Sequence, residues 1–374
     1  SDVLSVDGKS LSDTHNHWSG LYGKRILHWQ FDPDDSLGPE DNPVFYDGNL
    51  FVNSGEVTFL PGTSFHAADS PDPTVYLTNS ATLNCEGTKE LPITFSNMGQ
   101  PAAVRFWTVV WGANKNATLN LSHTSLGPAE IGVYANGPTD DEKWETEGQI
   151  SVVAHHNDFT GTIQGFCWFY EKGHNFLTAL FNHFAGGGDE PALLVHQEDG
   201  HDGTTDIIFV GNNIVGQPGF KFEVTDPGAL TLELHHNYLE EVDEVISGDV
   251  SPDAVLPALT NPIDLDFVPE QWLFMNSEYT TTSSWVTEGQ PVPVAVLGSA
   301  NENGVANSYP VRLQTIGSPL DSIIIELAEP PGLEGQYHIL HGSLAADTNQ
   351  GGHTLAATVG DAIPGSYTHP SPRD

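Results

Sequence analysis

Short runs of alternating apolar and polar residues dominate this chain, and helical periodicity is almost absent. Runs rich in Val, Ile, Phe and Thr are separated by turns that draw on 38 glycines and 26 prolines. Alternation with a period of two predicts half-buried strands, and frequent Gly and Pro predict tight turns between them. The pattern therefore predicts an all-β protein built from many short strands.

A polar pair followed by a bulky residue recurs through the middle of the chain. The bulky member returns at intervals of 24 to 33 residues, as Met98, Leu126, Phe159, Phe184, Ile214 and Tyr238. Such intervals suit one coil of a parallel β-helix, whereas propeller blades run to roughly 40–50 residues. Asn suits the corner of a coil, because it tolerates left-handed backbone angles and its amide bonds to the next Asn. We expect the bulky residues to point into the core and the Gly that follows most of them to turn the chain again.

The stretch VAHHNDFTG at 153–161 allows two interpretations. Its paired histidines, with Asn and Asp beside them, are residue types that bind metals or form catalytic clusters. Similar polar pairs return in VGNNIVG at 210–216 and in LELHHNYLE at 232–240. This recurrence favours corners of a repeat, so we predict that these residues are mainly scaffold.

NLFVNSGEVTFLPGTSFHA at 49–67 is followed by VYLTNSATLNCEGTKELPITFSN at 75–97. The matching positions are Pro61-Gly62-Thr63, Leu83, Gly87-Thr88, Pro92-Ile93, Phe95 and Ser96. In these positions the chain resembles the opening coils of bacterial secreted and surface β-helix proteins, in the pectin-lyase-like superfold. The resemblance implies a right-handed parallel β-helix and an extracellular location. It implies no reaction, because that superfold hosts lyases, hydrolases, phage tailspikes and non-catalytic adhesins.

Changes in pattern divide the chain into four segments. Residues 1–44 are rich in aromatics and lack the repeat, which predicts an N-terminal cap or assembly segment, since an open strand edge needs a cover. Residues 45–245 form the predicted β-helix of about eight coils. Residues 246–284 are loop-rich and are predicted to be a linker. Residues 285–374 alternate strands with Gly-rich turns, which predicts a C-terminal β-sandwich of Ig-like type.

The charge and hydropathy of the chain restrict the classes of partner that it is expected to bind and the compartment in which it is expected to lie. The chain has 50 acidic and 11 basic residues, a formal net charge of −39, and phosphate binding needs clustered Lys and Arg, which argues against nucleic acid. No apolar run reaches the roughly 18 residues of a membrane helix, so no membrane insertion is predicted. An acidic surface suits saline or calcium-containing surroundings. A start at Ser1 without a leader indicates either a mature chain whose signal was removed or a trimmed chain. The acidic surface and the first of these alternatives favour an extracellular or cell-surface location. Cys85 and Cys167 permit one disulfide or two buried thiols.

The densest polar cluster is VHQEDGHDGTTD at 195–206. Carboxylate oxygens at close spacing bind Ca²⁺, and the candidate ligands are Glu198, Asp199, Asp202 and Asp206. A pair of carboxylates also hydrolyses glycosides, and the candidates for that role are Asp189, Glu198, Asp199 and Asp202. The third interpretation is an ordinary solvated loop. The polygalacturonase motifs NTD, GHG and RIK are missing, and the basic residues within the repeat are dispersed.

Two functions are consistent with this sequence. The first is a secreted, non-catalytic structural or surface protein that self-assembles into extracellular fibres or matrix through its termini. It would associate with itself or with other surface proteins and would require no cofactor. The alternative is a carbohydrate-active enzyme (a glycoside hydrolase or polysaccharide lyase) or a tailspike-like protein that binds polysaccharide. That alternative places the site at 189–206, with Ca²⁺ as the candidate ion.

Overall fold

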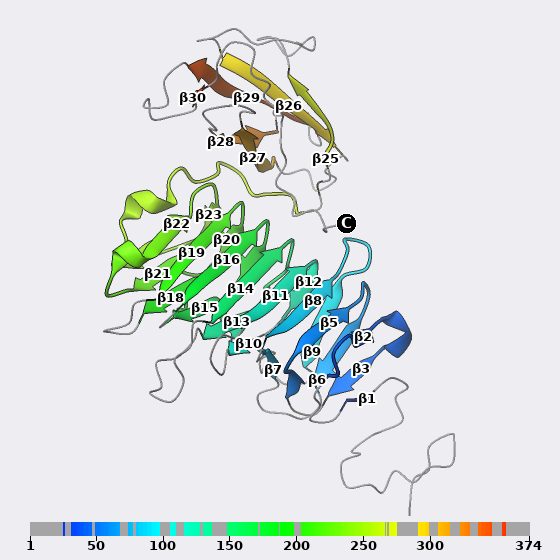
Figure 1. The fold of residues 1–374 in the computed structure, drawn as a ribbon. Helices are drawn as coiled ribbons and strands as arrows, with labels where there is room; N and C mark the ends of the chain where they lie inside the picture. The colour runs from blue at the N-terminus through cyan, green and yellow to red at the C-terminus, as the bar shows by residue number, and fades with distance from the viewer. Residues whose placement is uncertain are drawn as a thin grey trace, which may run out of the picture. The chain divides into compact units, whose positions relative to one another are not determined.

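The computed structural model of the chain is shown in Figure 1. It describes residues 25–26, 31–46, 49–67, 74–77, 80–97, 105–109, 116–127, 129, 131–136, 148–170, 173–186, 188–197, 203–265, 267, 269–274, 291–298, 306–314, 322–329, 336–345 and 354–356. The chain divides into two compact units. The first consists of Ser1–Phe209, Ile214–Leu234 and Glu240–Ala254, and the second of Val210–Asn213, His235–Leu239 and Val255–Asp374.

Three sheets of parallel strands contain most of the strand residues that the structure describes. Sheet I has the order β1 (Arg25–Ile26), β3 (Val44–Tyr46), β6 (Ser64–Ala67), β9 (Ile93–Asn97) and β12 (Thr124–Leu126). Sheet II has the order β4 (Leu50–Val52), β7 (Thr74–Leu77), β10 (Arg105–Val109), β13 (Ile131–Asn136), β15 (Gln164–Tyr170), β18 (Leu193–Gln197), β21 (Phe220–Glu223) and β24 (Ile246–Gly248). Sheet III has the order β2 (Ser36–Leu37), β5 (Gly55–Phe59), β8 (Ala81–Glu86), β11 (Asn116–Ser122), β14 (Gln149–His155), β16 (His174–Leu180), β19 (Thr204–Val210) and β22 (Leu230–Glu233).

The chain visits these sheets in turn and returns to each of them one coil later. In the pair β11–β14, for example, Asn116 lies opposite Gln149 and Ser122 opposite His155, in parallel register. A three-stranded sheet contains β17 (His183–Ala185), β20 (Asn213–Val215) and β23 (Tyr238–Glu240). The predicted all-β class is confirmed, and the coil-by-coil order is compatible with a β-helix-like fold (Figure 1).

Alternation along the strands builds the core. β14 shows it plainly, since Ile150, Val152 and Ala154 are buried while their neighbours are partly exposed. A residue that points inward meets its counterpart one coil along, about 4.8 Å away. Each inward-pointing residue therefore contacts the residue at the same position in the next coil, and every further coil extends the core.

Aromatic rings fill two parts of this core. The ring of Phe65 lies 4.5 Å from that of Phe59 and is stacked at 4.5 Å on that of Phe95. Farther along, the rings of Phe159 and Phe184 are stacked at 4.8 Å. Burying one such side chain contributes about 1.5–3 kcal/mol, so these columns are a main source of stability.

Two short 3-10 helices lie in the first unit and a third spans the junction, η1 (Pro39–Asp41), η2 (Pro227–Ala229) and η3 (Pro252–Val255). None of the helices in the described part of the chain has the length and hydropathy to cross a membrane. β1 and β2 lie within the segment 1–44 that the sequence assigned to a cap, and β24 lies within the predicted linker 246–284. The roles predicted for those two segments stay predictions.

In the second unit, the segment after η3 is hydrogen-bonded to the corner residues of that unit. Val255, Leu259 and Ile263 are buried. Leu259 N donates to Asn237 O at 2.9 Å, while Ile263 exchanges two hydrogen bonds of 2.8 Å with the side chain of Asn213. These contacts give the start of the predicted linker a defined structure.

The remaining described strands form a four-stranded sheet and a hairpin. The sheet has the order β25 (Pro269–Phe274), β26 (Pro291–Gly298), β29 (Gln336–Ala345) and β30 (Thr354–Ala356). Its first two pairings are antiparallel and the third is parallel. The hairpin joins β27 (Ser308–Gln314) to β28 (Ser322–Ala328) in antiparallel register. Strands are thus present in 285–374, whereas an Ig-like arrangement stays a prediction.

Both cysteines are buried and free. Cys85 lies on β8 and Cys167 on β15. Burial, and next the nearby Glu86 carboxylate, raises the pKa of the Cys85 thiol. Of the two possibilities that the sequence left open, the structure has two buried thiols.

Candidate functional site

The Asn residues of the repeat form hydrogen-bonded pairs between successive coils. In the first unit, Asn157 Nδ2 donates to Asn182 Oδ1 at 2.9 Å, and Asn157 Oδ1 accepts from Thr124 N at 2.9 Å. In the second unit, Asn212 Nδ2 donates to Asn237 Oδ1 at 3.0 Å. These four corner asparagines are all at most 1 % exposed. They are scaffold, as the repeat predicted, because a buried amide that is fully used between coils has no access to a substrate.

The left-handed backbone lies one residue before each corner Asn, which corrects the sequence interpretation. His156 and Phe181 both have φ of 55°, and His236 has φ of 56°. Gly211 and His123 occupy the same place in their coils, with φ of 70° and 43°. The turn is made before the Asn, so the Asn side chain is left to bond to the next coil.

The bulky residues after the polar pair are core residues. Leu126, Phe159, Phe184 and Ile214 are at most 1 % exposed. Tyr238 is partly exposed, and Met98 lies outside the described residues. The inward direction predicted for this position is confirmed for the four buried members.

The structure describes only some of the candidate carboxylates that the sequence suggested. Glu198, Asp199 and Asp202 lie outside the described residues. Asp189 is exposed in the turn before β18, and Asp206 lies on β19. No group of three or more His, Cys, Asp or Glu suited to a metal occurs among the residues that the structure describes. The predicted Ca²⁺ and catalytic sets therefore stay predictions.

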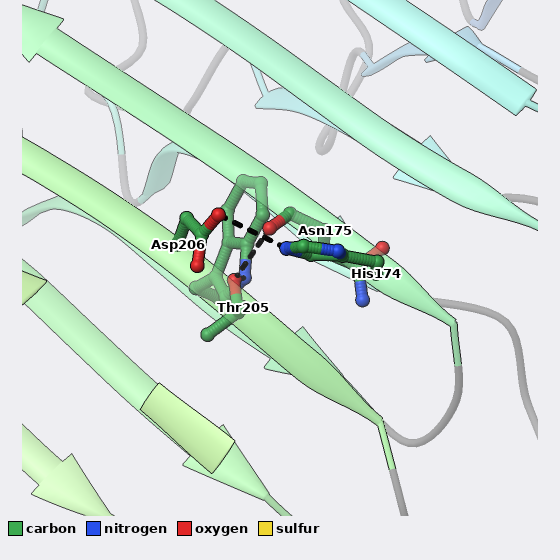
Figure 2. A network of polar contacts seen from close by, with 5 residues as sticks. His174, Asn175, Thr205 and Asp206 are labelled. Carbon is green, nitrogen blue, oxygen red and sulfur yellow. Dashed lines mark hydrogen bonds and ion pairs between the residues drawn. The ribbon is translucent and has the colours of Figure 1, made fainter. Parts of the chain in front are cut away.

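Asp206 has a different neighbour from those the sequence suggested (Figure 2). Its Oδ2 lies 3.0 Å from Nε2 of His174, one coil away on β16. Beside them, Thr205 Oγ1 donates to Asn175 O at 3.2 Å. The same hydroxyl accepts a hydrogen bond from Trp168 Nε1 at 3.0 Å. The His174 and Asp206 side chains are 53 % and 36 % exposed, and exposed pairs of this kind contribute about 0–1 kcal/mol. These contacts connect β16 to β19, and β19 to β15.

An open pocket of about 830 Å³ lies over the C-terminal coils of sheet II. Within it, Glu223 Oε2 lies 3.1 Å from His196 Nδ1, and Glu223 Oε1 lies 2.8 Å from Lys221 Nζ. Asp249 and Thr225 also line it. The His196 ring lies 4.9 Å from the ring of Phe169. The pocket thus combines hydrogen-bond donors and acceptors.

The pair formed by Glu223 and Lys221 sets the charge of this pocket. The hydrogen bond from Lys221, then that from His196, lowers the pKa of the Glu223 carboxyl. The hydrogen bond to Glu223 raises the pKa of the Lys221 ammonium in turn. Glu223 is therefore ionised at neutral pH, so it accepts hydrogen bonds or takes a proton and does not act as an acid.

The polar cluster at 195–206 contains His196, whereas Glu223 was not singled out from the sequence and Lys221 counted only as one of the dispersed basic residues. His196 and Glu223 occupy paired positions on β18 and β21. The 27-residue step between them matches one coil, so the repeat length was the available signal. Sequence reasoning also missed Ser96 and His66, whose Oγ and Nδ1 lie 2.7 Å apart on adjacent strands of sheet I.

No protein family, curated protein or solved structure matches this chain.

Proposed function

We propose that the chain is a right-handed parallel β-helix with a structural role: a secreted, non-catalytic surface or matrix protein that self-associates. The observation that supports this role is the burial of the corner asparagines, which join one coil to the next. Residues that look reactive in the sequence are used to hold coils together. In this proposal 285–374 is an Ig-like β-sandwich.

Self-association follows from the ends of the sheets. β4 is an outer strand of sheet II with three residues, of which Phe51 is partly exposed. Phe31 N donates to Phe51 O at 2.8 Å, so this edge is covered in part by the chain itself. Outer strands carry backbone groups that pair with another chain unless they are covered or charged. Addition of a strand from a neighbouring molecule is one recurrent way to satisfy such an edge.

Light scattering and electron microscopy of the full chain test this role. We expect assemblies at physiological salt with calcium. Phe51→Lys puts a charge on the outer strand and should reduce assembly, whereas Tyr134→Lys, in the middle of the same sheet, should not. Finding monomers alone across protein concentrations would overturn the proposal.

The pocket around His196 and Glu223 favours a second candidate function, the binding or cleavage of a polysaccharide. Glu223 and Asp249 line the pocket with two carboxylates, and the partly exposed ring of Phe169 lies 4.9 Å from the His196 ring, outside the residues that line the pocket. Because Lys221 is paired with Glu223 and the chain carries a charge of −39, the ligand would be a neutral glycan. A panel of neutral glycans is the probe, with Glu223→Gln as the variant and Glu90→Gln, at an exposed residue outside the pocket, as the matched control. Binding or cleavage that Glu223→Gln leaves unchanged would remove this candidate.

The predicted Ca²⁺ site at 198–206 is tested separately. If Ca²⁺ binds there, EDTA should lower the melting temperature, and Asp202→Asn should abolish that effect. An unchanged melting temperature would end this part of the proposal.

A further inference from the structure

Two corners of the chain carry the same pair of adjacent histidines before the corner Asn. They are His155-His156 in the first unit and His235-His236 in the second. The second histidine of each pair is left-handed, with φ of 55° and 56°. In a regular strand adjacent side chains point to opposite faces. The left-handed residue breaks that alternation and brings both rings to the same side.

The resulting ring geometry is nearly the same at both corners. The rings of His155 and His156 are perpendicular, at 87° and 5.4 Å, and those of His235 and His236 are at 87° and 4.9 Å. The two Nδ1 atoms lie 3.2 Å apart in the first pair and 2.8 Å apart in the second. Since the arrangement occurs twice, 80 residues apart in sequence, it belongs to the motif and not to one local environment.

These separations match those of two nitrogens bound to one metal ion. With a metal–nitrogen distance of about 2.0–2.1 Å, nitrogens 3.2 Å apart subtend about 100° and nitrogens 2.8 Å apart subtend about 86°. The first angle is close to tetrahedral and the second close to square, as Zn²⁺ and Cu²⁺ prefer. We propose that each histidine pair chelates one divalent transition-metal ion, Zn²⁺ or Cu²⁺, through its two Nδ1 atoms.

Metal binding requires no loss of a proton from either imidazole ring. In the metal-free corner one Nδ1 carries a hydrogen and donates it to the other Nδ1. When the metal binds, that ring changes tautomer and carries its hydrogen on Nε2, so both Nδ1 lone pairs face the ion. Water completes the coordination shell. The net charge of −39 raises the local concentration of cations around the chain.

The neighbours of the first pair hold it in position. His156 is only 9 % exposed, and its ring lies 5.0 Å from that of His123 and 5.3 Å from that of Phe181. His155 is partly exposed and gives the ion its route from solvent. The site adds a link at a corner that already carries Asn157, so the metal would reinforce the scaffold.

Metal titration of the untagged full chain tests the proposal. Isothermal titration with Zn²⁺ and with Cu²⁺ is compared for the native chain, His155→Gln, His235→Gln and the double variant. Each single variant should lose one equivalent of metal and the double variant two. His66→Gln, at a histidine outside the pairs and outside the pocket, should lose none. Zn²⁺ should also raise the melting temperature of the native chain and leave that of the double variant unchanged.

Two results would overturn the proposal. One is a folded double variant, judged by circular dichroism, that keeps the native stoichiometry and the native Zn²⁺-dependent shift in melting temperature. The other needs no variant: a Cu²⁺ electron paramagnetic resonance spectrum of the native chain without coupling to imidazole nitrogen. Coupling to two nitrogens per ion is the expected spectrum.

Discussion

Replacing Asn157 by Ala tests whether the corner asparagines hold the coils together. The Asn157 side chain is fully buried and makes three hydrogen bonds: it accepts from Thr124 N at 2.9 Å and donates to Leu121 O at 3.2 Å and to Asn182 Oδ1 at 2.9 Å. Each bond contributes about 1 kcal/mol net, and a buried group left without its partner costs about 1–3 kcal/mol. We expect the free energy of unfolding to fall by about 3–4 kcal/mol.

Asn120→Ala is the matched control. Its side chain is partly exposed and makes one hydrogen bond, to Asn84 Oδ1 at 2.7 Å. Water replaces that bond in the variant, so the loss should be about 0.5–1 kcal/mol. Both variants remove the same atoms from neighbouring coils, and only burial and the number of partners differ.

Urea unfolding and amide hydrogen exchange measure the two effects. The exchange experiment is local, because the Thr124 amide bonds directly to Asn157 Oδ1 and should lose protection in Asn157→Ala alone. Equal losses of unfolding free energy in the two variants, with Thr124 still protected, would refute the reasoning that the buried amides join the coils.

Three further predictions concern single sites. Burial lowers the pKa of His183. Its contribution to the free energy of unfolding is therefore complete above about pH 6.5 and declines as the pH falls from there toward the folded pKa. In His183→Gln, the free energy of unfolding should depend less on pH over that range. Cys85 and Cys167 are buried thiols, so a thiol reagent should label neither in the native chain and both in denaturant, and a mobility shift with reductant would contradict this. Gly165→Ala would put a Cβ 2.5 Å from the Phe184 ring, and the overpacking should lower the free energy of unfolding by about 1–3 kcal/mol; an unchanged melting temperature would count against it.

Local pattern was enough to predict the strands and their succession. The buried and partly exposed residues alternate along β14 and β16, and the interval between corners matches the step from one strand to its parallel partner. The reason is that a repeating coil makes each residue's main neighbour its own counterpart one period along. Sequence distance then stands for spatial distance, which is seldom true of other folds.

The candidate site was harder to predict, because its pairs depend on register. His196 meets Glu223, and Asp206 meets His174. A one-residue slip in register moves a side chain to the other face, and interval lengths that vary between coils leave that slip undetermined. The dense run of acidic residues at 195–206 therefore did not indicate which carboxylate would form a hydrogen bond with another side chain.

The sequence by itself determined the all-β class, the recurrence of the corner and the burial of four of the bulky residues that follow it, Leu126, Phe159, Phe184 and Ile214. Only the tertiary structure decided that the turn falls one residue before each Asn, as at His156 and His236. It also decided that paired histidines face one another across 3.2 Å and 2.8 Å. The physical reason is that hydrophobic periodicity specifies which face of a strand is buried, whereas the direction of a side chain at a corner follows from backbone angles that the pattern does not encode.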